Sequence, residues 1–423
     1  MSSAPIGKIC VLGLGYIGLP TASVIASRGV DVVGVDVKQD VVDCINRGEI
    51  HIVEPDLEGV TASAVHRGHL RASTEPEPAD AFVIAVPTPF HDGKAELGYV
   101  WSAARAIAPH LRPGTLVVLE STSPPGTTDQ MTRILAESRP DLRFPARDGN
   151  GPVDVNIAYC PERVLPGRVL TELIDNSRVI GGISAACSDR AKALYRIFCR
   201  GDLHVTDART AEMCKLTENA FRDVNIAFAN ELSRVCDTIG INVWELIRLA
   251  NQHPRVNILQ PGPGVGGHCI AVDPWFIVEA APDATPLIRT ARQVNDDKPK
   301  RVLGMVREAL EATRAATGRR PTVALLGLAF KADVDDLRES PALAIAETVA
   351  SWNDCETLVS EPNIEDLPAS LSGMEGVRFV TDIDQTVAAA DIVVMLVNHR
   401  PYLAIERESL ASKTIIDTRG VWA

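Results

Sequence analysis

The sequence predicts an α/β protein with two Rossmann-like, doubly wound domains joined by a connector of long helices. Short apolar runs alternate with helical segments at residues 8–205, and again from Pro321 onward, which predicts a largely parallel sheet in each half. Between them, residues 206–318 are dominated by long helical periods, which predict the connector. The expected domains are residues 1–205, 206–318 and 319–423, and a chain of 423 residues is long enough for two or three.

The composition limits the classes of function. A hydrophobic fraction of 46% supports large cores, and a net charge of −13 argues against nucleic acid or an anionic membrane surface as a partner. No segment has the length and character of a signal peptide or a membrane span. The nine cysteines form no C-x-x-C pair and have no metal-ligand spacing. We therefore expect free thiols in a reducing cytoplasm and no bound metal.

The first strand and helix carry a dinucleotide-binding signature. A short apolar run ends at Gly13, and the motif Gly-Leu-Gly-Tyr-Ile-Gly opens the helix that follows. In this pattern Gly13 makes the tight turn, Gly15 lets a pyrophosphate approach the backbone, and Gly18 lets the helix pack on the strand. The next predicted strand ends at Asp36, which would accept hydrogen bonds from a ribose and repel a 2′-phosphate. The sequence therefore predicts NAD rather than NADP.

Three further strands of the first half end in polar residues. The run from Ala81 leads to Thr88, the run from Thr115 leads to Thr122, and the run from Val155 leads to Glu162 and Arg163. Open parallel sheets bind their ligands at the carboxyl ends of the strands, which makes these residues candidates for the site. Threonines that cap helices or turns, and a surface ion pair of Glu162 with Arg163, are the alternative interpretations.

The central region reads as three helices. The first runs from about Thr210 to Ile239, the second from Asn242 to Asn251, and the third from Leu287 to Thr317 with an interruption expected at Pro299. On the first of them, a Lys, an Asn and an Arg share one helix face; they are Lys215, Asn219 and Arg222. Such a face suits an oxygen-rich ligand, although a solvated stripe has the same pattern.

A loop rich in glycine and proline, Gln260–Pro274, separates the second and third helices and contains Cys269. Neither a helix nor a strand propagates through such a sequence, so the loop can hold one side chain among exposed backbone N–H groups. A thiolate there would be a nucleophile beside a ready oxyanion site. The alternative is a small buried hydrophobic residue.

The last third of the chain predicts a second sheet without a full glycine signature. Apolar runs predict strands at Thr322–Leu328, Glu356–Ser360, Val377–Thr381, Asp391–Val397 and Thr414–Asp417. Three cations follow strand ends, where they could meet phosphates or lie solvated; they are Lys331, Arg338 and Arg419.

Five motifs together resemble the nucleotide-sugar dehydrogenases of the UDP-glucose/GDP-mannose dehydrogenase family, over essentially the whole chain and in the family's order. They are Gly-Leu-Gly-Tyr-Ile-Gly-Leu-Pro from Gly13, Cys-Pro-Glu-Arg-Val-Leu-Pro-Gly from Cys160, Lys-Leu-Thr-Glu-Asn from Lys215, Gly-Gly-His-Cys-Ile-Ala-Val-Asp-Pro from Gly266, and Leu-Ala-Phe-Lys from Leu328. The resemblance implies that a primary alcohol of the sugar is oxidised to a carboxylate with two NAD per turnover. The second motif and His268 look most like the members that oxidise UDP-N-acetyl-D-mannosamine for bacterial surface polysaccharides.

The resemblance also implies catalytic roles. Cys269 becomes the covalent nucleophile, which adds to an aldehyde and then carries a thioester that water cleaves. Lys215 stabilises or exchanges a proton with the oxyanion, Asn219 assists, and Asp273 positions Lys215 or a water. Glu162 and Thr122 are the candidates for activating the hydrolytic water. Where UDP-glucose dehydrogenases carry a second Glu, this chain has Pro166, which puts a two-carboxylate hydrolysis in doubt.

The resemblance further implies the binding residues and a homodimer. The positions that match NAD contacts are Tyr16, Ile17, Asp36, Thr88, Thr122 and Arg338. The positions that match contacts with the UDP-sugar, besides Lys215 and Asn219, are Arg163, Val164, Arg222, His253, Arg255, Gly266, Lys331 and Arg419. The helical middle makes the dimer in this family, and Arg255 reaches toward the partner's site.

Other functions remain open at this point. Within the class, the substrate could instead be UDP-N-acetylglucosamine or UDP-glucose. A catalytically inactive NAD-binding regulatory protein is the alternative from another class, and it has no need of Cys269, Lys215, Asn219 and Asp273 together. A two-electron hydroxyacid dehydrogenase is a third alternative, and it needs no cysteine.

Overall fold

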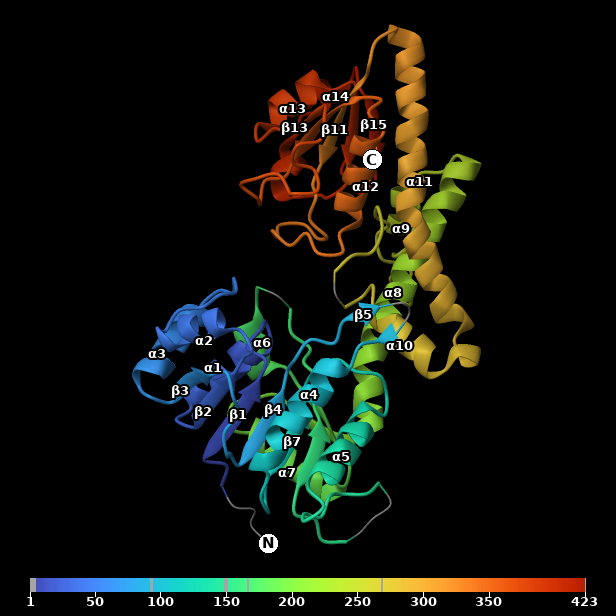
Figure 1. Ribbon diagram of the computed structural model, residues 1–423. Coiled ribbons are helices and arrows are strands. Elements are labelled where there is room, and N and C mark those ends of the chain that lie inside the picture. Colours follow the sequence, from blue (N-terminus) through green and yellow to red (C-terminus); the bar gives the residue numbers. More distant parts are fainter. Residues whose placement is uncertain (1–4, 92–93, 148–150, 166, 268, 423) are drawn as a thin grey trace. The chain divides into compact units, whose positions relative to one another are not determined.

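A computed structural model describes the chain except residues 1–4, 92–93, 148–150, 166, 268 and 423 (Figure 1). The chain divides into two compact units, one formed by Met1–Glu218 with Trp275–Pro282 and the other by Asn219–Pro274 with Asp283–Ala423. Two of the three boundaries fall inside α-helices, namely α8 (Ala208–Ile239) and α10 (Asp273–Ala280), and the third falls in the short 3-10 helix Pro282–Ala284. Each unit has its own large sheet. The predicted division into three domains at residues 205 and 318 stays a prediction.

The first unit contains an eight-stranded sheet in the order β10-β9-β8-β7-β4-β1-β2-β3. Its strands are β1 (Lys8–Leu12), β2 (Asp31–Val35), β3 (Leu70–Ser73), β4 (Ala81–Ile84), β7 (Leu116–Leu119), β8 (Asn156–Tyr159), β9 (Arg178–Gly182) and β10 (Leu203–Asp207). The strands from β3 to β8 are parallel, whereas β9 pairs antiparallel with β8 and parallel with β10. The order reverses between β1 and β4, so a ligand crevice is expected at their carboxyl ends.

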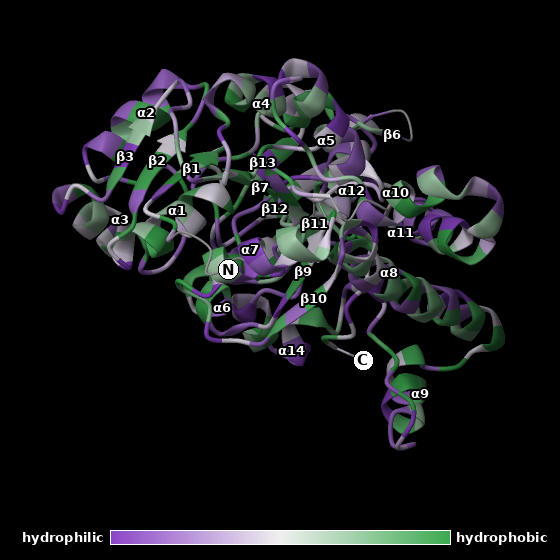
Figure 2. Ribbon diagram, turned by 90° about the horizontal axis from the view of Figure 1, so that it is seen from below, coloured by the Kyte–Doolittle hydropathy of each residue, from purple (hydrophilic) through white to green (hydrophobic). Residues whose placement is uncertain are grey.

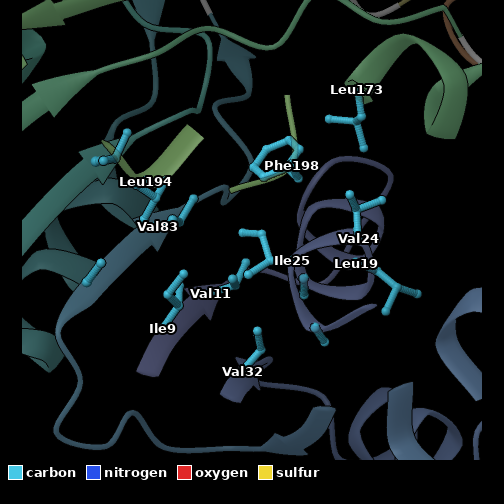
Figure 3. Packing of buried hydrophobic residues seen from close by; sticks show 14 of the residues in the cluster. Ile9, Val11, Leu19, Val24, Ile25, Val32, Val83, Leu173, Leu194 and Phe198 are labelled. Atoms are coloured by element: carbon cyan, nitrogen blue, oxygen red, sulfur yellow. The ribbon is translucent and has the colours of Figure 1, made fainter. Parts of the chain in front are cut away.

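Helices cover both faces of this sheet because alternate residues of each strand point to opposite sides. Ile9 and Val11 of β1 pack with Leu19 and Ile25 of α1 (Figure 3), while the intervening residues of β1 pack under α4 and α5. The α-helices of this unit, besides the first part of α8 and most of α10, are α1 (Gly18–Ser27), α2 (Gln39–Asn46), α3 (Leu57–His66), α4 (Gly98–Ile107), α5 (Thr127–Ser138), α6 (Val169–Asp175) and α7 (Ala185–Tyr195). A two-stranded hairpin, β5 (Phe90–His91) with β6 (Lys94–Ala95), stacks Phe90 on Trp275 of α10.

The second unit contains a five-stranded parallel sheet in the order β13-β12-β11-β14-β15. Its strands are β11 (Thr322–Leu326), β12 (Glu356–Ser360), β13 (Val377–Phe379), β14 (Ile392–Met395) and β15 (Thr414–Asp417). On one face Val323 and Leu325 pack with α12 (Pro341–Ser351), and on the other Ala324 and Leu326 pack with α13 (Ile383–Ala389). A short helix, α14 (Arg407–Leu410), precedes β15. The predicted fold class of two Rossmann-like sheets with a helical connector is confirmed.

The connector contains two long helices, α8 and α11 (Pro286–Thr317), and the short helix α9 (Val243–Ala250). The predicted interruption at Pro299 is wrong, because α11 continues through this residue. A proline inside a helix costs about 3 kcal/mol. The helix continues because Val302, Val306 and Leu310, which follow the proline, are buried in the core of the second sheet.

A buried polar network joins α8 to α11. The carboxylate of Asp223 accepts hydrogen bonds from Nη1 of Arg292 at 2.6 Å and from Nδ2 of Asn295 at 2.8 Å. Nδ2 of Asn230 donates to Oδ1 of Asn295 at 2.9 Å, and Oδ1 of Asn230 accepts from the backbone N–H of Gly262 at 3.0 Å. Since Gly262 begins the glycine loop, the helix pair fixes the start of the loop that carries the candidate nucleophile.

Hydrophilic and hydrophobic residues alternate along α8 and α11 (Figure 2). Among the helices that the structure describes, none is long and apolar enough to cross a membrane.

Candidate active site

The glycine turn of the first unit has the shape that the motif predicts. Gly13 has φ +88°, and a Cβ atom on it would lie 2.5 Å from the carbonyl oxygen of Ala85. A Cβ atom on Gly18 would lie 1.8 Å from the carbonyl oxygen of Gly13, so α1 can pack this closely only with glycine there. A Cβ atom on Gly15, by contrast, would meet no described atom within 4 Å. The turn is closed on the protein side and open at Gly15, which fits the approach of a pyrophosphate.

Asp36 is held in place by this turn. Its Oδ2 accepts the N–H of Leu14 at 3.0 Å and its Oδ1 accepts the N–H of Lys38 at 3.1 Å. A carboxylate has about four acceptor positions, so two remain for the hydroxyl groups of a ribose. Tyr16 and Ile17 lie just before α1, Tyr16 being exposed. The residues of this edge therefore fit the adenosine and pyrophosphate of NAD.

The loops after β4 and β7 are tied together at the same edge of the sheet. The hydroxyl of Thr88 donates to the carbonyl oxygen of Thr122 at 2.7 Å. The second loop is also held from α8, because the carboxylate of Glu212 accepts the N–H groups of Gly126 and Thr128 at 2.6 and 2.8 Å. Both threonines thus lie at the carboxyl ends of two neighbouring strands, β4 and β7, and their roles stay predictions.

Glu162 follows β8 and is almost completely buried beside an arginine that the motifs do not include. Nη2 of Arg178 donates to Oε2 of Glu162 at 2.9 Å, and the N–H of Arg163 donates to Oε1 at 2.6 Å. The guanidinium of Arg178 lies 5.0 Å from the ring centroid of Tyr195 and 5.3 Å from that of Phe198. The aromatic rings and the ion pair together hold Glu162 in one orientation.

A second buried carboxyl group shares this layer. The hydroxyl of Tyr195 donates to Oε1 of Glu120 at 2.6 Å, and no described group binds Oε2. Burial raises the pKa of Glu120 to about 7, the charge of Arg178 acts in the opposite direction, and Glu162 adds to the rise. Glu120 is therefore largely protonated below neutral pH, and Glu162 is the nearer ion-pair partner of Arg178.

The loop after Glu162 is engaged with the protein itself. Nη1 of Arg163 donates to Glu218 at 2.7 Å, its Nη2 binds the carbonyl oxygen of Ser177, and Val164 packs against the core of the first sheet. Glu54 accepts the N–H groups of Gly167 and Val169 at 2.9 and 2.7 Å and so fixes the end of the loop. Pro166 lies outside the described residues.

The candidate nucleophile belongs to the second unit. Cys269 is exposed, and its carbonyl oxygen accepts the N–H groups of Val272 and Asp273 at 3.1 and 2.8 Å, one turn before α10. The amino end of a helix is a position where peptide dipoles favour negative charge, which suits a thiolate or an oxyanion. His268, one of the subfamily pointers, lies outside the described residues.

The glycines before Cys269 allow close packing on the loop after β11. A Cβ atom on Gly266 would lie 2.4 Å from the carbonyl oxygen of Glu339 and 3.1 Å from Cβ of Phe330. Gly267, with φ +83°, faces the ring of Phe330. The Cys269 loop and the loop that carries Lys331 are therefore direct neighbours within this unit.

The amide of Asn219 is fixed by Asp273, since its Nδ2 donates to Oδ2 of Asp273 at 2.5 Å. Lys215 lies one turn earlier on α8, and Arg222 lies further along the same helix and is exposed. Asp273, which was predicted to position Lys215 or a water, thus binds the side-chain amide of Asn219.

The remaining predicted cations have different surroundings. Lys331, His253 and Arg255 are exposed. Arg338 forms a two-point pair with Asp336 through Nε at 2.8 Å and Nη2 at 2.6 Å, and its contact with NAD stays a prediction. A Cβ atom on Gly262 would lie 2.7 Å from Nη1 of Arg419, and burial lowers the pKa of this guanidinium.

The structure adds several residues that the motifs do not reveal. Glu54, Arg178 and Glu212 hold the segments that follow strands in the first unit, and Glu120 accepts a hydrogen bond from Tyr195 of α7. Their only signal in the sequence is an ionisable residue within or beside an apolar segment, and that signal names no partner.

Comparison with known proteins places these features in one family. Residues 7–199 match the NAD binding domain of the UDP-glucose/GDP-mannose dehydrogenase family, residues 209–297 its central domain and residues 324–423 its UDP binding domain. The chain belongs to this family. This dehydrogenase is therefore an NAD-dependent oxidoreductase of nucleotide sugars, and the predictions of family and cofactor are confirmed.

Individual relatives match over nearly their whole length. UDP-N-acetyl-D-mannosamine dehydrogenase of Escherichia coli is 60% identical over 418 residues, which cover 98% of this chain and 99% of that protein. NDP-N-acetyl-D-galactosaminuronic acid dehydrogenase of Ralstonia nicotianae is 59% identical, with 98% and 96% covered. The structure of UDP-D-ManNAc dehydrogenase from Pyrococcus horikoshii matches with a TM-score of 0.85 at 39% identity, covering 98% and 96%.

The raised pKa of Glu120 predicts a pH-dependent stability. A carboxyl group whose pKa rises from 4.5 in the unfolded chain to about 7 on folding contributes stability below pH 4.5 that is lost as the pH rises toward 7. The loss amounts to about 3 kcal/mol, since one pKa unit corresponds to about 1.36 kcal/mol. Glu120→Gln stays neutral and keeps an oxygen for Tyr195. In denaturant unfolding of the full chain, the free energy of unfolding of the variant should therefore rise relative to that of the native protein between pH 4.5 and 7.

The exposed residue Glu137 of α5 offers the control, because Glu137→Gln should keep a constant difference from the native protein over that range. A constant difference for Glu120→Gln as well would refute the assignment of a raised pKa.

Proposed function

We propose that this dehydrogenase oxidises the primary alcohol of UDP-N-acetyl-D-mannosamine to the carboxylate of the corresponding uronate, using two NAD⁺ per substrate. The observation that carries the proposal is the full-length likeness, at 60% identity, to the E. coli enzyme of that name. The exposed Cys269, one turn before α10, and the fixed pair of Asn219 and Asp273 support it, because a four-electron oxidation needs a nucleophile to hold the aldehyde.

The oxidation proceeds in three stages. In the first, the alcohol loses a hydride and a proton and becomes an aldehyde. In the second, the sulfur of Cys269 bonds to the aldehyde carbon while the proton of its thiol passes to the aldehyde oxygen, and the resulting thiohemiacetal loses a hydride and a proton to become a thioester. In the third, water cleaves the carbon–sulfur bond, which gives the carboxylate and returns the thiol. NAD⁺, when bound, supplies the acceptor for each hydride.

Holding the aldehyde on Cys269 has a physical advantage. A free aldehyde hydrates or leaves, whereas the covalent adduct keeps its carbon in place for the second oxidation. Lys215 stabilises the developing oxyanion and exchanges its proton, and Asn219 assists with its second amide N–H. Asp273 orients that amide through the 2.5 Å hydrogen bond. The dipole at the start of α10 favours the same negative charge.

Glu162 and Thr122 are assigned to the hydrolytic water. Glu162 is buried, oriented by Arg178 and by the N–H of Arg163, and has the fixed geometry that a general base requires. Since Pro166 replaces a second carboxylate, one carboxylate has to serve this stage.

The UDP-sugar is assigned to two sets of residues, one for the nucleotide and one for the sugar. Lys331 and Arg419 take the nucleotide diphosphate, in agreement with the match of residues 324–423 to a UDP binding domain. The residues assigned to the sugar and its acetamido group, besides Lys215 and Asn219, are Arg163, Val164, Arg222, His253, Arg255 and Gly266. Arg163 is held by Glu218 and Val164 by the core, so these two act by shaping the loop.

UDP-N-acetyl-D-galactosamine is the second candidate substrate. It is favoured by the 59% identity to a relative named for N-acetyl-D-galactosaminuronic acid, which is nearly as similar as the E. coli enzyme. Both candidates carry a 2-acetamido group, and they differ in the orientation of this group and of the 4-hydroxyl.

We also propose that the enzyme is a homodimer formed through α8. Phe221, Phe228 and Val235 follow one another at intervals of seven residues, with 70%, 52% and 47% of their surface exposed. This spacing places them on one side of the helix, as at the seam between two packed helices. A second copy of the same stripe would bury them. The cytoplasmic location stays a prediction from cysteine usage.

A panel of nucleotide sugars tests the proposed function. With UDP-N-acetyl-D-mannosamine and excess NAD⁺, we expect two NADH per substrate consumed, measured by absorbance. UDP-N-acetylglucosamine should be turned over more slowly, and UDP-glucose should lose on the order of 10⁴ in kcat/KM, because a site built to pair an amide is left with unpaired polar groups. Higher kcat/KM with UDP-N-acetyl-D-galactosamine would establish the second candidate. Comparable turnover of UDP-glucose would contradict both.

Replacement of the nucleophile tests the covalent route. Cys269→Ala should reduce uronate formation by at least about 10³-fold, since no adduct can form, while UDP and NAD⁺ still bind in calorimetric titrations. Cys44→Ala, at a half-buried position on α2, is the matched control and should keep normal activity. Uronate formed at the native rate by Cys269→Ala would rule out the thioester mechanism.

A charge on the exposed stripe tests the dimer. Phe228→Glu should convert the dimer to a monomer in light scattering after size exclusion, because two carboxylates would meet in an apolar seam. Asp237→Ala, on the opposite side of α8, should leave the mass unchanged. A native protein that is already monomeric at micromolar concentration would refute this interface.

A further inference from the structure

The two sheets solve the same structural problem with an acidic residue. After the first strand of each sheet, a glycine with positive φ, Gly13 at +88° or Gly327 at +94°, turns the chain. In the first sheet Asp36, at the end of the second strand, accepts the N–H groups of Leu14 and Lys38. In the second sheet the equivalent acid is Glu361. It accepts the N–H groups of Leu328 and Asn363, which correspond in position to Leu14 and Lys38.

Glu361 differs from Asp36 because all of its hydrogen-bond acceptor positions are occupied. Oε2 of Glu361 accepts the N–H groups of Leu328 at 2.8 Å and Ala329 at 3.1 Å, and it binds Nε2 of His399 at 2.9 Å. Its Oε1 accepts the N–H and the side-chain amide of Asn363 at 3.0 and 3.1 Å. Five donors exceed the four acceptor positions of a carboxylate, and both Glu361 and His399 are buried. No oxygen remains for a ribose.

The protonation of His399 follows from its neighbours. Nδ1 accepts the backbone N–H of Asp333 at 2.9 Å and lies 2.9 Å from Nδ2 of Asn363, which is also a donor. Nδ1 is therefore unprotonated, and Nε2 carries the hydrogen that it donates to Glu361. The imidazole is a neutral bridge with one acceptor end and one donor end.

This bridge holds both ends of one short loop. Glu361 fixes Leu328 and Ala329 on one side, and His399 fixes Asp333 on the other, where the backbone has φ +60°. Lys331 lies between these anchors and is exposed. The neighbouring Phe330 packs against Gly266 and Gly267 of the Cys269 loop, so the position of this segment also sets that of the nucleophile loop within the unit.

We propose that Glu361 and His399 are positioning residues for binding of the nucleoside diphosphate, acting through the loop that carries Lys331. The proposal rests on the proposed function only in taking Lys331 as the residue that meets the diphosphate. Neither Glu361 nor His399 touches the ligand, since both are sealed inside the sheet edge.

Two substitutions of His399 separate its two contacts. The amide of Asn reaches about as far as Nδ1, so His399→Asn keeps an acceptor for the N–H of Asp333 and loses the bond to Glu361. The amide of Gln reaches about as far as Nε2, so His399→Gln keeps a donor for Glu361 and loses the anchor at Asp333. Asp333 is the anchor of the loop on the far side of Lys331. We therefore expect His399→Gln to lower the affinity for UDP at least tenfold and His399→Asn to lower it less than threefold.

Calorimetric titration of the full-length variants with UDP alone measures these affinities, and titration with NAD⁺ serves as the control for folding of the first unit. Lys331→Ala and the double variant Lys331→Ala/His399→Gln complete a double-mutant cycle. If His399 acts through Lys331, the double variant should bind UDP no worse than Lys331→Ala alone.

The outcomes separate the two claims. Unchanged UDP affinity in His399→Gln, an equal loss in His399→Asn and His399→Gln, or fully additive losses in the cycle would overturn the positioning role. Failure of the native protein to bind UDP would instead overturn the proposed function. Loss of UDP binding in His399→Gln, with NAD⁺ binding retained and non-additive coupling to Lys331, supports the proposal.

Discussion

The hydrogen bonds between an acidic side chain and the turn after the first strand set the ligand-binding edge of both sheets. The N–H groups of such a turn point away from the strand ladder, and an unpaired buried donor costs about 1–3 kcal/mol. Asp36 satisfies Leu14 and keeps two acceptor positions, whereas Glu361 satisfies Leu328 and is saturated by further donors. With the same topology, the sheet of the NAD binding domain thus has a carboxylate with open acceptor positions, and the sheet of the UDP binding domain has a carboxylate whose acceptor positions are all occupied. The difference lies in side chains and not in strand order.

The nucleophile loop depends on a different set of buried contacts. A loop rich in glycine has many conformations in the unfolded chain, so holding it in one conformation requires contacts from more than one side. Asn230 holds Gly262 from α8, and Phe330 with Glu339 encloses Gly266. Asn230 is itself linked through Asn295 to Asp223, whose pair with Arg292 has no access to water. Removing one partner of such a pair costs roughly 3–5 kcal/mol, so the placement of Cys269 is tied to the stability of the helix pair.

Much of the fold could be predicted because its strands are apolar runs and its first turn follows a glycine pattern with a known geometry. The strands without an apolar run could not be predicted: β9 begins with the buried Arg178 and ends in two glycines, and β10 is mostly exposed. At Pro299 the helix-breaking tendency of proline predicted an interruption. The helix continues because the residues after Pro299 are buried in the core of the second sheet. In the candidate site, single residues such as Asp36 and Cys269 could be identified from motifs. Contacts such as that of Glu361 with His399, 38 residues apart, need the folded chain.

The buried layer around Arg178 bears on how one carboxylate, Glu162, can serve the hydrolysis that we propose. A general base has to be ionised and correctly aimed, and neither condition is easily met for a carboxyl group away from water. Arg178 aims Glu162 with one guanidinium at 2.9 Å, and this guanidinium lies near the rings of Tyr195 and Phe198. Glu120 would compete for this charge if it were ionised, but burial raises its pKa to about 7 and Tyr195 already donates to it. The protonated fraction of Glu120 grows as the pH falls below about 7. In that form Glu120 leaves the charge of Arg178 to Glu162, the one carboxylate to which we assign the hydrolytic water.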